Sequence, residues 1–211
     1  MTSWATLSNL ATAFGTLVLA AATFSSVRSA NRSAQAAERA VQASIRPILL
    51  PSRLEDRPEK VIWIDGHHVM LEGGAAYIEL IDGSLYLAIS LRNVNAGIAV
   101  LQGWDPSDRV RMSTERNVPV SEFRGQTRDL YIPANDVGYW HAAIRSEDDP
   151  AFGALCEVAT NHQPFGVDLL YTDLEGGQRT ISRFALRPRS DGKGWIAATS
   201  RHWGLDRPAP R

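Results

Sequence analysis

The chain has 211 residues, of which 44% are hydrophobic and 21% charged, which is typical of a globular protein and not of a disordered one. Its 22 basic and 23 acidic residues give a formal net charge of −1, so no overall positive field favours nucleic acid, and we expect no nucleic-acid partner. The lone cysteine, Cys156, excludes an internal disulfide and agrees with a reducing compartment.

The N-terminal stretch, residues 1–27, contains no charged side chain before Arg28. About 20 apolar residues in a helix cross a bilayer, so the segment predicts a transmembrane anchor over 1–27, with the lipid bilayer as a partner. A cleaved signal peptide is an alternative, but it would normally carry basic residues before the apolar stretch. An interfacial helix would need a charged face, and a buried core helix of this length would be long.

The charges that follow the anchor predict its orientation. Arg28, Arg32, Arg39 and Arg46 lie on its C-terminal side and are opposed only by Glu38. Because basic residues near a span stay on the cytoplasmic side, we expect a single-pass cell (inner) membrane protein with its N-terminus outside and its C-terminal domain in the cytoplasm.

Residues 28–46 predict a helical stalk, because they are rich in Ala, Gln, Arg and Ser and contain neither Gly nor Pro. Pro47 ends this helix. Small residues recur at a spacing of three and four in the anchor and the stalk, so self-association through either remains open beside a simple solvated spacer.

After Pro47 the hydrophobic pattern changes to period two, which is typical of strands. Residues 47–60 are predicted as a linker and first edge segment, and 61–203 as a β domain. Asp82-Gly83 is a strong two-residue hairpin signal, and the strand 85–92 after it alternates as a half-buried strand does. The strands are expected over 61–64, 68–71, 76–81, 85–92, 98–101, 128–132, 137–144, 165–171, 179–186 and 195–199.

One short helix is expected over 151–159, after Asp149 as N-cap and Pro150 at the first position. Residues 105–117 are expected to be a long connection, and 204–211 a basic, Pro-rich tail. The fold class is therefore mainly β: a transmembrane helix and stalk followed by a β-sandwich, for which an immunoglobulin-like topology is one alternative.

Candidate chemistry is sparse along the chain. His67 and His68 are neighbours on a strand and point to opposite faces, and the other histidines are scattered, so we expect no metal site. Paired carboxylates could support glycosidase chemistry, but Glu147-Asp148-Asp149 lies just before the expected helix, and Asp173 and Glu175 fall in a hairpin turn, so structural roles are favoured. No phosphate loop or nucleophile motif is present, so the sequence predicts no cofactor and no catalytic residue, and leaves enzymatic activity uncertain.

A mixture of basic and aromatic residues near the C-terminus suits a partner surface, because Arg and Trp are favoured at protein contacts. The alternative is that Trp203 simply covers one end of the domain. The candidate residues are Arg183, Arg201, His202, Trp203 and Arg207.

The chain resembles an uncharacterised group of small, actinomycete-type bacterial proteins with one membrane helix, an Arg-Pro junction and a cytosolic β domain. Similar sequences are expected to carry glycine where this chain has Asn95. The resemblance covers nearly the whole chain and implies architecture but no activity. The matching segments are Ala36-Ala37-Glu38-Arg39-Ala40, Arg46-Pro47, Leu91-Arg92-Asn93-Val94, Gln178-Arg179-Thr180-Ile181-Ser182-Arg183-Phe184 and Arg201-His202-Trp203.

The leading functional hypothesis from sequence is a membrane-tethered, non-enzymatic interaction module or accessory subunit with an unknown protein partner. A small-ligand-binding or sensor domain is the alternative, and a membrane-anchored enzyme with an unrecognised site is a further one.

Overall fold

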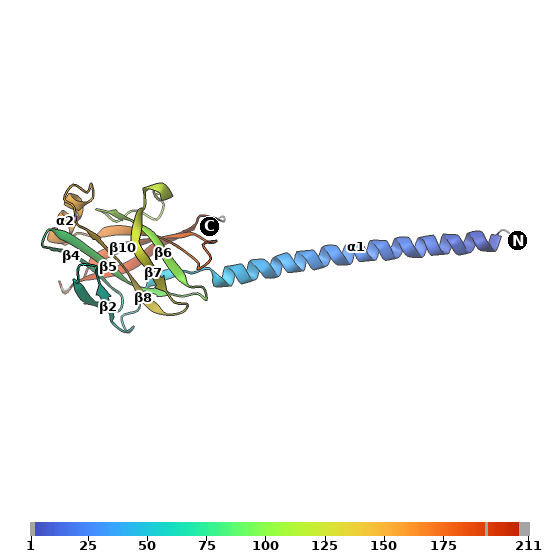
Figure 1. The fold of residues 1–211 in the computed structure, drawn as a ribbon, viewed down its shortest axis with the longest axis horizontal. Coiled ribbons are helices and arrows are strands. Elements are labelled where there is room, and N and C mark those ends of the chain that lie inside the picture. The colour runs from blue at the N-terminus through green and yellow to red at the C-terminus, as the bar shows by residue number, and fades with distance from the viewer. Residues whose placement is uncertain (1–2, 193, 207–211) are drawn as a thin grey trace. The chain divides into compact units, whose positions relative to one another are not determined.

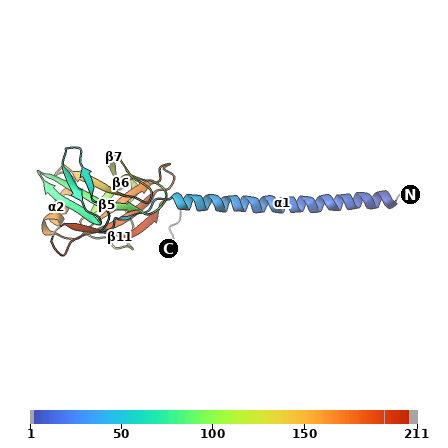
Figure 2. The ribbon, with the colours of Figure 1, turned by 90° about the horizontal axis from the view of Figure 1, so that it is seen from below.

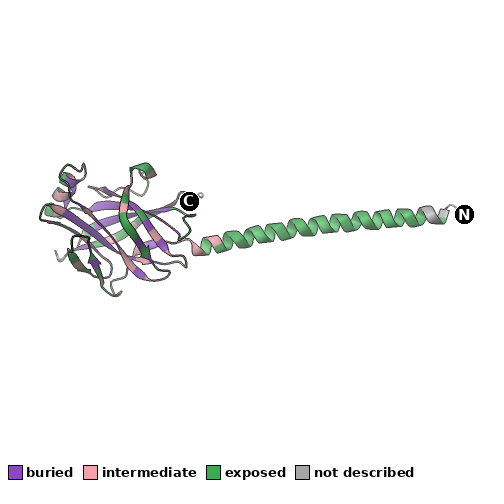
Figure 3. Cartoon of the chain, viewed as in Figure 1, coloured by how far each residue is buried: buried purple, intermediate pink, exposed green. Residues whose placement is uncertain are grey.

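The computed structural model describes residues 3–192 and 194–206, and the chain divides into two compact units, Met1–Ser44 and Ile45–Arg211. The described residues of the first unit belong to one continuous helix, α1 (Ser3–Ile45), which covers most of the predicted anchor and stalk. Its residues are exposed along almost all of the described length (Figure 3).

Helix α1 is long and apolar enough to cross a membrane, by its length and composition. Its threonine hydroxyls do not interfere with such a role. Thr12, Thr16 and Thr23 each donate to the carbonyl four residues earlier, at 2.9, 2.8 and 2.7 Å. A hydroxyl that is satisfied within its own helix needs no water, which lowers the cost of placing it in lipid.

The second unit is mainly β, with strands that wrap around a common interior (Figures 1 and 2). Nine of its strands form one hydrogen-bonded sheet in the order β1-β5-β4-β11-β10-β9-β6-β7, with β8 also paired to β5. The elements are β1 (Leu49–Pro51), β2 (Glu59–Ile62), β3 (His68–Leu71), β4 (Ala75–Ile81), β5 (Ser84–Asn93), β6 (Ala99–Ser107), β7 (Arg124–Ile132), β8 (Val137–Ile144), α2 (Phe152–Asn161), β9 (Phe165–Thr172), β10 (Thr180–Pro188) and β11 (Trp195–Gly204), with a short 3₁₀ helix at Val120–Glu122.

The immunoglobulin-like sandwich is not confirmed, because the strands form a curled half-barrel instead of two stacked sheets. Strand β11 joins the two halves: it pairs with β10 along its length and with β4 through Trp195 and Ile196. This continuous hydrogen bonding lets one sheet coil around the core, as twisted antiparallel sheets do when they approach closure.

The predicted hairpin at Asp82-Gly83 is confirmed. Both residues have positive φ, 48° and 75°, as a two-residue turn between β4 and β5 requires. The strand that follows is not half-buried, however, since every residue from Leu85 to Leu91 is buried. The separate hairpin β2–β3 covers its outer face and places Trp63 beside Tyr86 in a second apolar cluster.

The main core lies inside the curl and is closed by helix α2 through Phe152, Leu155 and Val158. The predicted cap at Asp149 is two residues too early, since the helix begins at Phe152 with Ala151 at the cap position. Asp149 lies outside the helix, and its Oδ1 accepts the N–H of Ala151, the residue at the cap position, at 2.9 Å.

The segment predicted as a linker and edge is packed into the β domain. Strand β1 pairs with the end of β5, and Pro47 and Leu49 are buried. The turn after β5 touches the same junction: Asn95 Nδ2 donates to the Arg46 carbonyl at 2.7 Å. A Cβ on Gly97 would lie 1.6 Å from the Ile45 oxygen, so Gly97 serves a close approach and not a left-handed turn.

Strands β7 and β8 are consecutive but not paired. The four-residue turn 133–136 joins them, yet β7 pairs with β6 and β8 pairs with β5, and no ladder joins the two strands in the described chain. We call the open line between them the seam. It leaves room for a pocket where the two strands diverge from their turn.

Candidate functional site

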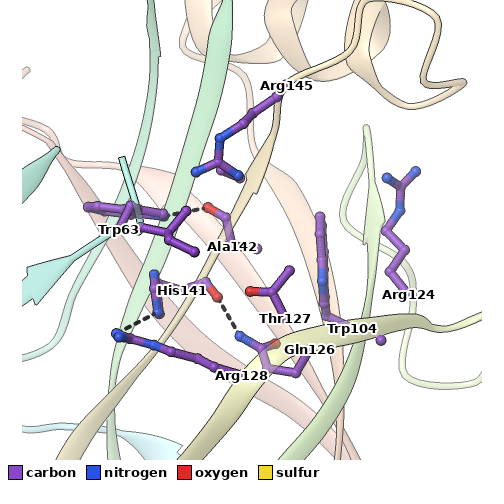
Figure 4. A pocket seen from close by; sticks show the side chains of 12 residues that line it. Trp63, Trp104, Arg124, Gln126, Thr127, Arg128, His141, Ala142 and Arg145 are labelled. Carbon is purple, nitrogen blue, oxygen red and sulfur yellow. Dashed lines mark hydrogen bonds between the residues drawn. The ribbon is translucent and has the colours of Figure 1, made fainter. Parts of the chain in front are cut away.

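A cavity of about 350 Å³ lies in the seam, and we call it the seam pocket. Figure 4 shows its lining from close by. Most of the lining comes from the two facing strands, β7 and β8, and the rest from β6, the β2–β3 hairpin and Arg145, directly after β8. The lining residues are Trp63, Ile64, Trp104, Arg124, Gly125, Gln126, Thr127, Arg128, His141, Ala142, Ala143 and Arg145.

A large bulge in β7 supplies the polar part of the lining. The register pairs of β6 with β7 run from Leu101↔Leu130 directly to Gly103↔Gly125. Residues 126–129 of β7 therefore lie opposite Gln102 alone. Bulges of this kind redirect side chains and occur often beside functional sites. Here the bulge brings Gln126, Thr127 and Arg128 into the seam pocket.

Side chains bridge the seam where backbone hydrogen bonds are missing. Gln126 Nε2 donates to the His141 carbonyl at 2.8 Å, and Arg128 Nη2 donates to His141 Nε2 at 3.2 Å (Figure 4). On the other side of β8, Trp63 Nε1 donates to the Ala142 carbonyl at 2.8 Å. These bonds fix the width of the opening without closing it.

Two of the three arginines in the lining are neutralised by carboxylates outside it. Arg124 forms a bidentate pair with Asp149, and Arg145 Nη2 lies 2.7 Å from Asp65 Oδ2. Both carboxylates are ionised: the Arg124 hydrogen bonds lower the pKa of Asp149. Burial acts to raise the pKa of Asp65, but its Arg145 and Tyr86 hydrogen bonds bring it down to about 2.

The third arginine, Arg128, forms no salt bridge within the described residues. Its guanidinium donates only to His141 Nε2 and to the Ile62 carbonyl, at 3.2 Å each. The pocket lining contains no Asp or Glu. One positive charge at the mouth of the seam pocket is therefore uncompensated.

His141 is held neutral. Burial, assisted by the positive charges of Arg128 and Arg145, lowers its pKa from 6.5 to about 4. Arginine can only donate, so His141 Nε2 is the acceptor, and the ring proton sits on Nδ1. That Nδ1–H is buried and has no hydrogen-bond partner among the described residues.

A second polar atom of the lining is also without a partner. Gln126 Oε1 is buried and accepts no hydrogen bond from the described residues, although the amide nitrogen of the same side chain is bonded. An unpaired buried donor or acceptor costs about 1–3 kcal/mol. A molecule that offers a matching group would recover that energy.

The remaining lining is apolar. The Trp63 and Trp104 side chains are 3% and 5% exposed, and Ile64, at 94% exposed, stands at the rim. The Arg124 guanidinium lies 5.1 Å from the Trp104 ring centroid, which keeps the ring in place by a cation–π contact. The site thus combines positive charge, unpaired polar atoms and aromatic walls.

The C-terminal residues proposed as a partner surface are only partly brought together. Arg201 is exposed and Trp203 half-buried, with the Arg201 guanidinium 5.3 Å from the Trp203 ring centroid. His202 points away from them and bonds Ser182 Oγ at 2.6 Å. Arg207 lies outside the described residues.

Arg183 does not belong to a surface, since it is 1% exposed. Its Nε and Nη2 bind both oxygens of Asp168 at 2.9 and 2.8 Å, and Nη1 binds the Met112 and Glu115 carbonyls at 2.7 and 3.0 Å. The residue is a buried clamp that holds the loop after β6, which explains why a charged residue lies within the buried run of β10.

The Ser182–His202 contact belongs to a hydrogen-bond chain inside the domain. Tyr171 Oη lies 2.8 Å from Ser182 Oγ and accepts the Leu49 N–H at 3.2 Å. Ser182 is fully buried, so its hydroxyl has no access to a substrate. The chain ties β1, β9, β10 and β11 together and has a structural role.

One feature of the sequence does point to the seam pocket. Arg124, Gln126 and Arg128 alternate along β7, which indicates one polar face on a strand. Their convergence on His141 depends on the bulge and on the unpaired strands, and neither feature can be read from periodicity.

No protein-family model matches the chain, and no curated protein matches it. Among solved structures, the chain is similar to one described as the crystal structure of a protein from Archaeoglobus fulgidus. The identity is 8%, the match covers 64% of this chain and 95% of that chain, and the TM-score is 0.24. A TM-score this low carries no argument about fold or function.

Proposed function

We propose that the protein is a membrane-tethered, non-enzymatic recognition module, and that the seam pocket is its binding site. The observation that supports this most is the uncompensated charge of Arg128, which lies beside buried polar atoms without partners and two tryptophans. Binding sites are typically apolar pockets with a few such convergent polar groups.

Helix α1 is proposed as the tether. It carries 27 uncharged residues before Arg28, and basic residues follow on one side only. The positive-inside tendency favours a single-pass cell (inner) membrane protein with the β domain in the cytoplasm. A tethered recognition domain suits an accessory subunit, which brings a bound molecule to a partner in the same membrane.

A site-specific photo-crosslinker tests this function in the native membrane. We would place it at Thr127, an exposed residue of the pocket lining, in the full-length chain. The matched control position is Glu175, which is exposed in the turn between β9 and β10 and does not line the pocket.

A specific adduct at Thr127, absent at Glu175 and lost with Arg128→Gln, supports recognition at the seam pocket. Mass spectrometry of the adduct separates a protein occupant from a small molecule. If Thr127 yields no adduct beyond those at Glu175, the seam pocket is not the recognition site and the proposal fails.

A further inference from the structure

We infer that the ligand of the seam pocket is a small organic monoanion, a carboxylate carried on a compact apolar or aromatic body. This inference rests on the proposed recognition function and adds the chemical class of the ligand. Size, charge and polar geometry each limit the class.

The size of the site favours a small molecule over a peptide strand. The cavity measures about 350 Å³, at the lower end of the range for small-molecule sites. The bridges from Gln126 and Arg128 to His141 cross the seam within it. An added strand would have to break both bridges, whereas a compact ligand can lie beside them.

The charge of the site favours one negative charge. Arg124 and Arg145 are already paired with Asp149 and Asp65. Arg128 alone has no carboxylate partner among the described residues, and a guanidinium matches a carboxylate in a planar, charge-assisted geometry. A dianion would leave a second charge uncompensated near buried apolar groups, which is costly.

The two unpaired polar atoms indicate where the rest of the ligand binds. The His141 Nδ1–H needs an acceptor and Gln126 Oε1 needs a donor, while Trp63 and Trp104 offer an apolar wall. A carboxylate that bears an apolar ring, with a hydroxyl or amine nearby, would satisfy the arginine, the wall and the amide oxygen together.

The test uses the full-length protein in lipid nanodiscs and isothermal titration calorimetry, with empty nanodiscs titrated as a blank. The probes are 4-ethylbenzoate, its neutral counterpart 4-ethylbenzamide, and acetate, which has the charge without the apolar body. The variant is Arg128→Gln. Its control is Arg187→Gln, which removes an exposed arginine of β10 that does not line the pocket.

We expect 4-ethylbenzoate to bind, and the amide and acetate each to bind at least about tenfold more weakly, since one charge-assisted hydrogen bond supplies roughly that factor. Arg128→Gln should weaken benzoate binding by a similar factor, and Arg187→Gln should leave it unchanged. Equal affinity for acid and amide, or for wild type and Arg128→Gln, overturns the inference.

The two proposals fail in distinguishable ways. If Thr127 crosslinks a specific occupant but 4-ethylbenzoate does not bind, the ligand class is wrong and the recognition function stands. If the occupant found by mass spectrometry is a protein, the small-molecule inference is overturned in the same way. Absence of both crosslinking and binding refutes both proposals.

Discussion

His141 shows how a single side chain links the site to stability. Its ring is 5% exposed, and the arginines around it oppose a further positive charge. In the unfolded chain the same ring has an ordinary pKa near 6.5 and takes up a proton as the pH falls. Protonation of His141 is therefore coupled to unfolding, and the folded state is most stable when this histidine is neutral.

Stability should fall as the pH is lowered from about 6.5 to about 4, because over that window the unfolded state binds a proton that the folded state excludes. The full loss is about 3 kcal/mol in the free energy of unfolding. Urea denaturation of the full-length protein, followed by tryptophan fluorescence at a series of pH values, measures it.

The variant His141→Gln should flatten this pH dependence, and His68→Gln, which removes an exposed histidine of β3, should not. His202 also has a lowered pKa through burial and nearby Arg46, so a weaker slope of the same sign remains. An unchanged slope in His141→Gln would show that His141 is not the titrating group.

Arg183, by contrast, is a charged residue that the fold buries almost completely. Its side chain is as buried as the apolar core residues. The fold accommodates the charge because Asp168 and the loop carbonyls accept hydrogen bonds from its guanidinium. Removing one partner of such a pair leaves an uncompensated buried charge. A basic residue in a strand therefore does not by itself indicate a surface position. This is why the sequence pattern suggested a partner surface for Arg183, which the fold buries.

At the scale of elements, the turn after β5 packs closely against the backbone of Ile45. Gly97→Ala should destabilise the protein by about 1–3 kcal/mol, because its new Cβ would overlap the Ile45 carbonyl and the backbone must shift. Gly153→Ala is the matched control, since it lies in helix α2 with open space around it.

The control should stabilise the protein by about 0.5–1 kcal/mol, as alanine does in a helix. The shift of each variant's denaturation midpoint from that of the wild type measures its effect. A neutral Gly97→Ala would mean that the junction is loose and that the close approach to Ile45 does not hold in solution.

The sequence predicted individual elements well and their assembly less well. The helix 28–46, the Asp82-Gly83 turn and most strands are local features, set by hydrophobic period and turn chemistry. The single curled sheet depends on β11 pairing with both β4 and β10, which are distant in sequence. The seam pocket depends on a bulge and on a hairpin that splays, so it appears only once the whole sheet is assembled.

For the whole molecule, the orientation of the tether is the main prediction. A C-terminal green fluorescent protein fusion should fluoresce and a C-terminal alkaline phosphatase fusion should be inactive, because the four arginines after the anchor favour a cytoplasmic β domain. Deletion of residues 1–27 should release the protein from the membrane fraction.

The charge variant Arg28→Glu/Arg32→Glu/Arg39→Glu serves as the comparison, because it removes most of the positive bias and should yield a mixed orientation. A wild-type fusion with active phosphatase and dark fluorescent protein would place the β domain outside and reverse the proposed topology.

The unpaired edges of β7 and β8 bear on how copies of the protein would interact when they lie close together. Copies confined to a surface meet far more often than copies in free solution, and an open strand edge is a template on which another copy can add its own strand. The bulge at 126–129 and the charges of Arg124, Arg128 and Arg145 make the seam a poor template, since a bulged, charged edge cannot extend a regular ladder. The residues proposed to receive a ligand would therefore also oppose the addition of a strand from a neighbouring copy.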